Sequence, residues 1–232
     1  PIAGMGGRVG LKGTDGEKVL KEALERGASS WAPMRALEAL KGLQGLREDV
    51  KWVTWPGEMG EDILREAGFE CDVKGRIEAG KTSAEDTRRA AAELLALGVE
   101  LILFAGGDGT ASDIVETVGK RVPILGIPSG VKMFSAVFSP TPSAAARLVS
   151  SFTRGEAKLV EREVMDIDEE AYRSGRLSAS LRGYAVTPYV SSMVLNGKSV
   201  VSHEDEELMK ESVAARVVEE MKPEATYVLG PG

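Results

Sequence analysis

One carboxylate, Asp108, stands in the glycine-rich stretch Gly106-Gly-Asp-Gly-Thr110, shortly after the apolar run over residues 101–104. A short apolar run that stops at glycines is typical of a strand buried on both faces of a parallel sheet. Residues 111–119 then have the composition of a helix. A strand, a glycine turn and a helix N-terminus hold phosphate, because glycines let the backbone approach and the first helical amides attract anions. An aspartate there repels phosphate, so we expect Asp108 to bind Mg²⁺ or to take a proton from an attacking hydroxyl.

Two other glycine-rich stretches carry cations. Residues 4–16 contain six glycines, with Arg8 and Lys12 between them. Two cations among glycines beside a strand end favour contact with an anion over a plain flexible loop. The stretch Gly126-Ile-Pro-Ser-Gly130 accompanies a predicted strand over residues 122–127, and Lys132 follows it. Lys132 is interpreted either as a phosphate ligand or as an ordinary exposed lysine.

The pattern of the whole chain predicts an α/β fold. Alternating strands and helices over residues 1–154 indicate a doubly wound, mostly parallel sheet, whose ligands bind beyond the carboxyl ends of the strands. Residues 159–167 and 177–187 alternate like strands across a polar stretch, which predicts an antiparallel hairpin. We therefore predict an α/β nucleotide-binding domain over residues 1–154 and a smaller, mostly β substrate domain over residues 155–232.

Local signals place the elements around these stretches. Thr82-x-x-Glu85 predicts the start of a helix that ends near residue 97, and Thr141-Pro142 predicts the start of another that ends at residue 153. Pro33 opens a helix that ends near Gly42, with Met34, Leu37 and Leu40 on its apolar stripe. Further expected elements are a helix over residues 58–67 and strands over residues 50–55 and 69–73. Asp86, Arg88 and Arg89 lie either on a solvated helix face or at a ligand.

Several residues with possible chemistry are better explained by packing or by solvent exposure. The tryptophans at positions 31, 52 and 55 could stack on adenine, but core or interface packing is the favoured interpretation. Cys71, the only cysteine, excludes an intramolecular disulfide and is interpreted as a small core residue. His203, the only histidine, lies among acidic residues and is interpreted as a surface residue, so no histidine-based triad or metal cluster is expected.

The three glycine stretches, in this order, resemble the signature of the superfamily of NAD kinases, diacylglycerol kinases and sphingosine kinases. Pro1-Ile-Ala-Gly-Met-Gly-Gly7 is similar to the Asn-Pro-x-x-Gly-x-Gly turn of those kinases. Within the superfamily the pattern is most similar to the ATP-NAD kinase-like branch, on residues 7–15, 130–133 and 229–232. The chain begins without methionine and ends inside this last motif, so we expect a fragment of a longer polypeptide.

The resemblance implies transfer of a phosphoryl group from ATP or polyphosphate, with Mg²⁺, to the 2′-hydroxyl of NAD, giving NADP. Asp108 is then the catalytic residue, which accepts the proton of the acceptor hydroxyl, and no metal-ligating side chain is assigned. The cations would neutralise charge that develops on the phosphoryl group. The candidate phosphate- and nucleotide-binding residues are Gly4, Gly6, Gly7, Arg8, Lys12, Gly106, Gly107, Gly109, Thr110, Ser129, Gly130 and Lys132.

Two departures from the NAD kinase pattern concern the acceptor. The Asn-Glu pair of the second domain has only Asn196-Gly197 as its counterpart, and Gly-x-Leu-Gly-Phe is replaced by Gly130-Val-Lys-Met-Phe134. One alternative is a lipid or small-alcohol kinase of the diacylglycerol kinase type, although no basic amphipathic stretch is present. The other is a nucleotide-binding sensor without catalysis, against which the intact Gly-Gly-Asp-Gly-Thr argues.

Composition limits the partners. The chain has 232 residues, 43% hydrophobic and 28% charged, as in an ordinary globular protein, and a formal net charge of −7. That charge argues against nonspecific binding to nucleic acid or to an anionic membrane. No apolar run approaches the roughly 20 residues that span a bilayer and no signal peptide is visible, so we expect a cytoplasmic protein. Its expected partners are small-molecule nucleotides, and the resemblance implies a homo-oligomer.

Overall fold

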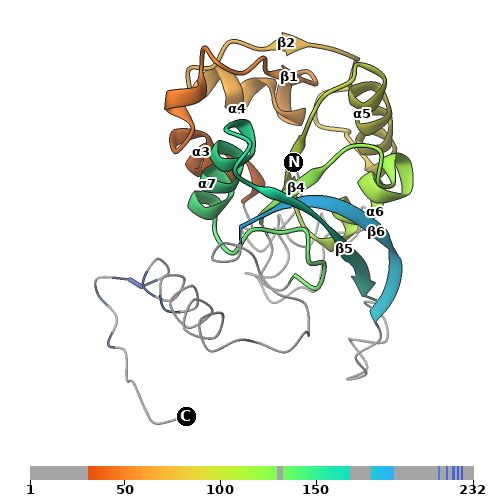
Figure 1. Ribbon diagram of the computed structural model, residues 1–232. Coiled ribbons are helices and arrows are strands. Elements are labelled where there is room, and N and C mark those ends of the chain that lie inside the picture. The colour runs from red at the N-terminus through yellow and green to blue at the C-terminus, as the bar shows by residue number, and fades with distance from the viewer. Residues whose placement is uncertain are drawn as a thin grey trace.

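The computed structural model describes residues 31–129, 133–167 and 179–190, and the single positions 214, 218, 221, 222, 224 and 226. Helices and strands alternate along these residues, as the sequence predicts for an α/β fold (Figure 1). In chain order the helices and strands are α3 (Ala32–Lys41), β1 (Val53–Thr54), α4 (Glu61–Glu66), β2 (Asp72–Val73), α5 (Ala84–Ala96), β3 (Ile102–Gly106), α6 (Asp108–Val118), β4 (Ile124–Pro128), α7 (Pro142–Thr153), β5 (Lys158–Ile167) and β6 (Ala179–Tyr189).

Strands β3 and β4 form the parallel pair at the centre of the described residues. They pair in register from Ile102 with Ile124 to Gly106 with Pro128, and β1 pairs in parallel with β2. Helices α3 and α7 lie on one side of β4 and helices α5 and α6 on the other (Figure 1). Every residue of β4 is buried, because both faces of this sheet are covered.

Each face of the sheet has its own hydrophobic core. Ile124 packs with Phe104 and with residues of α6, whereas Leu125 and Ile127 pack with residues of α3 and α7. Two of the tryptophans pack against other residues, as expected: the half-buried Trp52 meets Phe69 edge to face, with ring centroids 5.0 Å apart. Trp55 is buried and lies against Gly75, with the Arg89 guanidinium 5.2 Å from its ring centroid.

Two helix caps explain where helices begin. The Thr141 hydroxyl accepts the Ala144 amide at 3.1 Å, which confirms the predicted start of α7. The cap predicted at Thr82 is wrong by one residue, because the Thr82 hydroxyl donates instead to Glu58, 3.0 Å away. Helix α5 is capped by Ser83, whose amide donates to the Asp86 carboxylate at 2.9 Å.

Other expected boundaries also shift. Strands β1 and β2 are two residues long, shorter than predicted, and the helix expected over residues 58–67 is divided by Gly60 into a 3₁₀ turn (Gly57–Met59) and α4. Gly60 has φ +134°, a conformation that interrupts an α-helix. Met34 is 59% exposed and so lies outside the buried face of α3, contrary to the expected stripe. A second 3₁₀ turn (Gln44–Leu46) follows α3.

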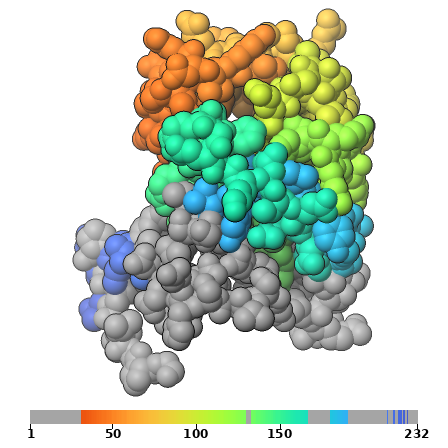
Figure 2. Space-filling model, in the orientation of Figure 1, coloured from red at the N-terminus to blue at the C-terminus, as the bar shows by residue number. Residues whose placement is uncertain are grey.

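Strands β5 and β6 form the predicted antiparallel hairpin, with a bulge between Val164 and Met165. Val164 and Ala185 are fully buried in the same hydrophobic cluster as β3, β4 and α6. Figure 2 shows α7 and the hairpin side by side on one face of the molecule. The domain boundary near residue 155 stays a prediction. No helix among the described residues is long and apolar enough to cross a bilayer.

Candidate active site

A single residue, Gly107, connects strand β3 to helix α6. The strand ends at Gly106, Gly107 precedes the helix, and Asp108 is the first residue of α6. The helix therefore begins three residues before the predicted position 111, and the first helical bond runs from the Ala111 amide to the Gly107 carbonyl at 3.0 Å. No side chain among the described residues caps α6, so its first amides are available to an anion at the carboxyl end of the sheet.

The glycines of this connection serve two different purposes. A Cβ built at Gly106 would lie 2.5 Å from the Thr110 hydroxyl, so Gly106 is required by the packing of Thr110. A Cβ at Gly107 or at Gly109 would meet none of the described residues within 4 Å. Gly107 has φ −119°, which any residue adopts. Neither packing nor backbone conformation among the described residues thus explains Gly107 and Gly109, whereas close approach of a ligand does.

Ser129 joins the end of β4 to the end of β3. Its amide donates to the Gly106 carbonyl at 3.1 Å, and its buried hydroxyl lies 3.4 Å from the Ile127 carbonyl. The structure thus brings Ser129 beside the Gly106–Thr110 stretch. The other candidates, Gly4, Gly6, Gly7, Arg8, Lys12, Gly130 and Lys132, lie outside the described residues, as do His203, Asn196 and the motif at residues 229–232.

The Asp108 carboxylate is held by two consecutive backbone amides. Its Oδ2 accepts the amide of Phe134 at 2.9 Å, and its Oδ1 accepts the amide of Ser135 at 2.8 Å. Each carboxylate oxygen has a second lone pair, so both keep the capacity to accept a further proton donor. The carboxylate is therefore fixed in orientation and remains chemically competent as a base.

Burial raises the pKa of the Asp108 carboxyl above its usual value. The Ser135 hydroxyl and the amides of Phe134 and Ser135 oppose this rise, since they stabilise the charged form, and the nearby charge of Asp166 adds to it. A raised pKa makes a carboxylate a stronger base, which suits the removal of a proton from a hydroxyl.

The segment of residues 133–139, which follows β4, connects the parallel sheet to the hairpin. Gly126 donates to the Val137 carbonyl and accepts the Ser139 amide, at 2.9 and 3.0 Å. The Ala136 amide donates to the Glu163 carbonyl of β5 at 3.0 Å. Gly126 therefore lies inside β4 and supports this segment, which corrects its assignment to a third glycine turn.

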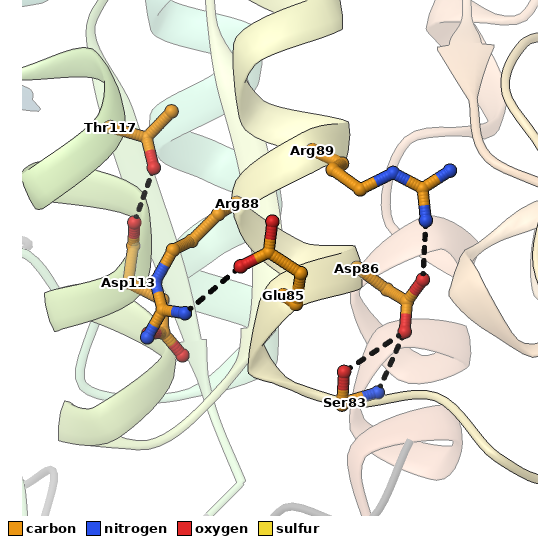
Figure 3. Close-up of polar contacts among 7 residues, drawn as sticks. All are labelled: Ser83, Glu85, Asp86, Arg88, Arg89, Asp113 and Thr117. Carbon is orange, nitrogen blue, oxygen red and sulfur yellow. Dashed lines mark hydrogen bonds and ion pairs between the residues drawn. The ribbon is translucent and has the colours of Figure 1, made fainter.

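One ion pair joins the first turns of α5 to α6, and two others run along α5 (Figure 3). The Arg88 guanidinium lies 2.7 Å from the Asp113 carboxylate of α6 and 3.3 Å from Glu85 on its own helix. Arg89 pairs with Asp86 at 3.1 Å. The sequence left open whether Asp86, Arg88 and Arg89 lie on a solvated helix face or at a ligand. The structure shows ion pairs of these residues along α5 and from Arg88 to α6. Arg88 therefore ties α5 to the helix that begins at Asp108.

Sequence reasoning missed the partners of Asp108. Phe134 and Ser135 contribute backbone amides, and a backbone donor leaves no trace in the residue type. Glu58, which accepts the Gly80 amide at 3.1 Å as well as the Thr82 hydroxyl, was also missed. Cys71 is half-buried, and burial raises the pKa of its thiol, which disfavours the thiolate that a nucleophile needs.

Residues 23–157 match the family model described as the ATP-NAD kinase N-terminal domain. The chain is similar to a protein of Pseudomonas putida (strain KT2440) named probable lipid kinase YegS-like, with 38% identity over 85 residues, 37% of this chain and 25% of that protein. A protein of the same name from Pseudomonas syringae pv. syringae (strain B728a) is 38% identical over 87 residues, 36% of this chain and 24% of that protein. The matched part is thus about a quarter of these relatives' length. No solved structure is significantly similar.

Proposed function

The chain belongs to the family of the ATP-NAD kinase N-terminal domain, and from this premise we propose that it is the nucleotide-binding part of a kinase. The proposed reaction transfers a phosphoryl group from ATP or polyphosphate to the 2′-hydroxyl of NAD, with NADP as product. The homo-oligomer, the cytoplasmic location and the restriction to small-molecule partners are part of the same proposal.

One observation carries the kinase proposal: no packing or backbone requirement among the described residues explains why the positions on either side of Asp108 are glycine. A Cβ at Gly107 or Gly109 would meet none of the described residues within 4 Å, neither glycine has a positive φ, and no described side chain caps the helix that begins there. Phosphate oxygens that approach the first amides of α6 would occupy that room. In this assignment Gly107, Gly109 and Thr110 bind phosphate, Gly106 leaves room for Thr110, and Ser129 supports them from the end of β4.

Asp108 is the proposed base. Its carboxylate sits at the start of the phosphate-binding helix, with its orientation fixed by the amides of Phe134 and Ser135. A carboxylate held in this way can accept the proton of an acceptor hydroxyl as the oxygen attacks the phosphorus. Its raised pKa favours that step.

The residues present fit a magnesium ion that arrives with the nucleotide. Mg²⁺ in kinases is held by one or two carboxylates together with substrate phosphates. The described residues contain no cluster of three or more acidic, histidine or cysteine ligands. An ion held mainly by the substrate phosphates would need no such cluster. Bound with ATP, the ion would neutralise charge on the phosphates.

A second candidate function is a lipid kinase. The relatives in Pseudomonas are named probable lipid kinases, and their similarity to this chain favours a lipid hydroxyl as the acceptor. Both functions use the same phosphate site and the same base. They differ in the acceptor, which in a NAD kinase is a nucleotide and in a lipid kinase a lipid hydroxyl.

The deciding experiment offers both acceptors to the full-length protein. The protein is incubated with Mg²⁺ and radiolabelled ATP, and in parallel with polyphosphate, in the presence of NAD or of diacylglycerol in mixed micelles. NADP formation that disappears in Asp108→Asn supports the first function, and labelled lipid with the same dependence supports the second. Nucleotide binding without NADP or phosphorylated lipid, from either donor, contradicts the kinase proposal and favours a sensor.

A further inference from the structure

Ser135 contacts both the candidate base and the hairpin. It is 2% exposed, and its amide donates to Asp108 at 2.8 Å. Its hydroxyl lies 3.0 Å from the amide nitrogen of Met165 and 3.0 Å from the Met165 carbonyl oxygen. A single buried residue therefore bonds to the start of α6 through its backbone and to β5 through its side chain, and the same hydroxyl favours the charged form of Asp108.

The contact with β5 falls at the bulge of the hairpin. Val164 pairs with Gly183 and Met165 pairs with Leu181, so Arg182 is the extra residue at this point. The Ala136 amide binds the neighbouring Glu163 carbonyl, and the Ser135 hydroxyl takes the place of a backbone partner for Met165. The segment thus covers the edge of β5, where the Ala136 amide and the Ser135 hydroxyl both bond to that strand.

We propose that Ser135 is a positioning residue, whose hydroxyl fixes to β5 the backbone that holds the Asp108 carboxylate. Without the hydroxyl, the amide and the carbonyl of Met165 lose their partner and the segment loses its attachment to the bulge. The amides of Phe134 and Ser135 are then held less firmly in position, and their hydrogen bonds to the Asp108 carboxylate weaken. This inference rests on the proposed role of Asp108 as the base.

Two charged side chains on the hairpin belong to the same environment. Asp166 follows Met165, and its Oδ2 accepts Nη2 and Nε of Arg182 at 2.7 and 3.1 Å. Among the described residues, Asp166 is the carboxylate whose charge raises the pKa of Asp108, while Arg182 compensates it. A shift of the segment against β5 changes both the amide contacts of Asp108 and its separation from Asp166.

Ser139 supplies a matched control. It is also a fully buried serine of this segment, and its hydroxyl lies 2.9 and 3.3 Å from the carbonyl oxygens of Thr141 and Gly126. None of the bonds found for its hydroxyl involves Asp108 or β5. Ser135→Ala and Ser139→Ala therefore remove the same group from the same segment and differ in whether Asp108 and the bulge are affected.

The test compares the two variants of the full-length kinase in steady-state kinetics over a range of pH. Ser135→Ala is expected to lower kcat roughly tenfold, the scale of a misplaced catalytic group, with the KM of the phosphate donor little changed. Weaker bonds to the carboxylate raise its pKa, so the acid limb of the kcat profile moves to higher pH. Ser139→Ala should leave that limb in place. Equal profiles and equal kcat values for the two variants would overturn the proposal.

A second measurement does not depend on activity. Amide hydrogen exchange is followed by mass spectrometry in peptides that cover residues 133–136 and 164–166, and both peptides should exchange faster in Ser135→Ala than in Ser139→Ala. Unchanged exchange in both peptides also overturns the coupling. If the wild-type protein phosphorylates no acceptor, but both peptides still exchange faster in Ser135→Ala than in Ser139→Ala, the structural coupling is retained and the kinase function is rejected. If Ser135→Ala does not fold, Ser135→Cys, which keeps a weak hydrogen-bonding group, takes its place.

Discussion

The Oδ1 atom of Asp108 accepts the backbone amide of Ser135 at 2.8 Å. This bond joins the first residue of α6 to a segment that continues, through the Ser135 hydroxyl, to the bulge in β5. The carboxylate that we propose as the base is therefore also a structural anchor. Substitutions at position 108 must be tested for both roles.

Asp108→Asn should separate the two roles. Turnover is expected to fall at least about a hundredfold, because the amide side chain is not a base, while nucleotide affinity changes little. An asparagine accepts hydrogen bonds only through its oxygen, so one of the amides of Phe134 and Ser135 loses its partner, at a cost of roughly 1–3 kcal/mol in the free energy of unfolding. Kinetics, calorimetric titration with nucleotide and urea unfolding measure these quantities.

Asp113→Asn is the matched control for that substitution. Asp113 lies on the same helix and pairs with Arg88, away from the segment that holds Asp108. It should keep near-normal turnover. Near-normal turnover in Asp108→Asn itself would exclude Asp108 as the base, whatever happened to stability.

The raised pKa of Asp108 predicts opposite pH dependences for activity and stability. The folded protein keeps this proton to a higher pH than the unfolded chain does. The contribution of Asp108 to stability is therefore fully present below its ordinary pKa and is lost as pH rises through the raised value. Turnover needs the charged form and should rise over the same range. Unfolding and kcat measured against pH in wild type and in Asp108→Asn check both, since the variant should lack this component of each profile.

Glycine substitutions should distinguish binding from packing. Gly107→Ala fits the backbone and meets none of the described residues, so the free energy of unfolding should change little while nucleotide affinity falls roughly tenfold or more, or about 1.4 kcal/mol. Gly106→Ala forces the new Cβ against Thr110 and should lower stability by about 1–3 kcal/mol. Calorimetric titration and urea unfolding of the two variants provide the comparison. Unchanged nucleotide affinity in Gly107→Ala would remove the phosphate assignment.

Much of the described fold follows from residue types. Apolar runs with the right spacing predicted β3 and β4, period-two alternation predicted the β5–β6 hairpin, and Thr141-Pro142 predicted the start of α7. These signals succeed because burial and capping depend on side chains. The start of α6 was misplaced because Asp108-Gly-Thr110 has a turn composition, and only the structure shows that these residues form the first helical turn.

The candidate site was less accessible to sequence reasoning. Asp108 and its flanking glycines could be identified from composition and order. The amides of Phe134 and Ser135 could not, because backbone donors carry no residue signal. Thr82 is a comparable case: its hydroxyl suits a helix cap, but Glu58, distant in the chain, binds it instead.

Packing explains why position 126 is glycine, and phosphate binding does not. A Cβ at this position would overlap the ring of Phe138 and lie 3.0 Å from the ring of Phe104, and these two rings already meet edge to face at 5.4 Å. Gly126→Ala should therefore lower the free energy of unfolding by about 1–3 kcal/mol, with little change in the nucleotide affinity of the folded protein. Gly45→Ala, at a glycine where a Cβ meets none of the described residues within 4 Å, is the control and should be nearly neutral. Adding Phe138→Leu to Gly126→Ala should restore part of the stability by making room for the methyl group, as a double-mutant cycle in urea unfolding would measure. A Gly126→Ala protein of wild-type stability with reduced nucleotide affinity would instead indicate that Gly126 contributes to nucleotide binding.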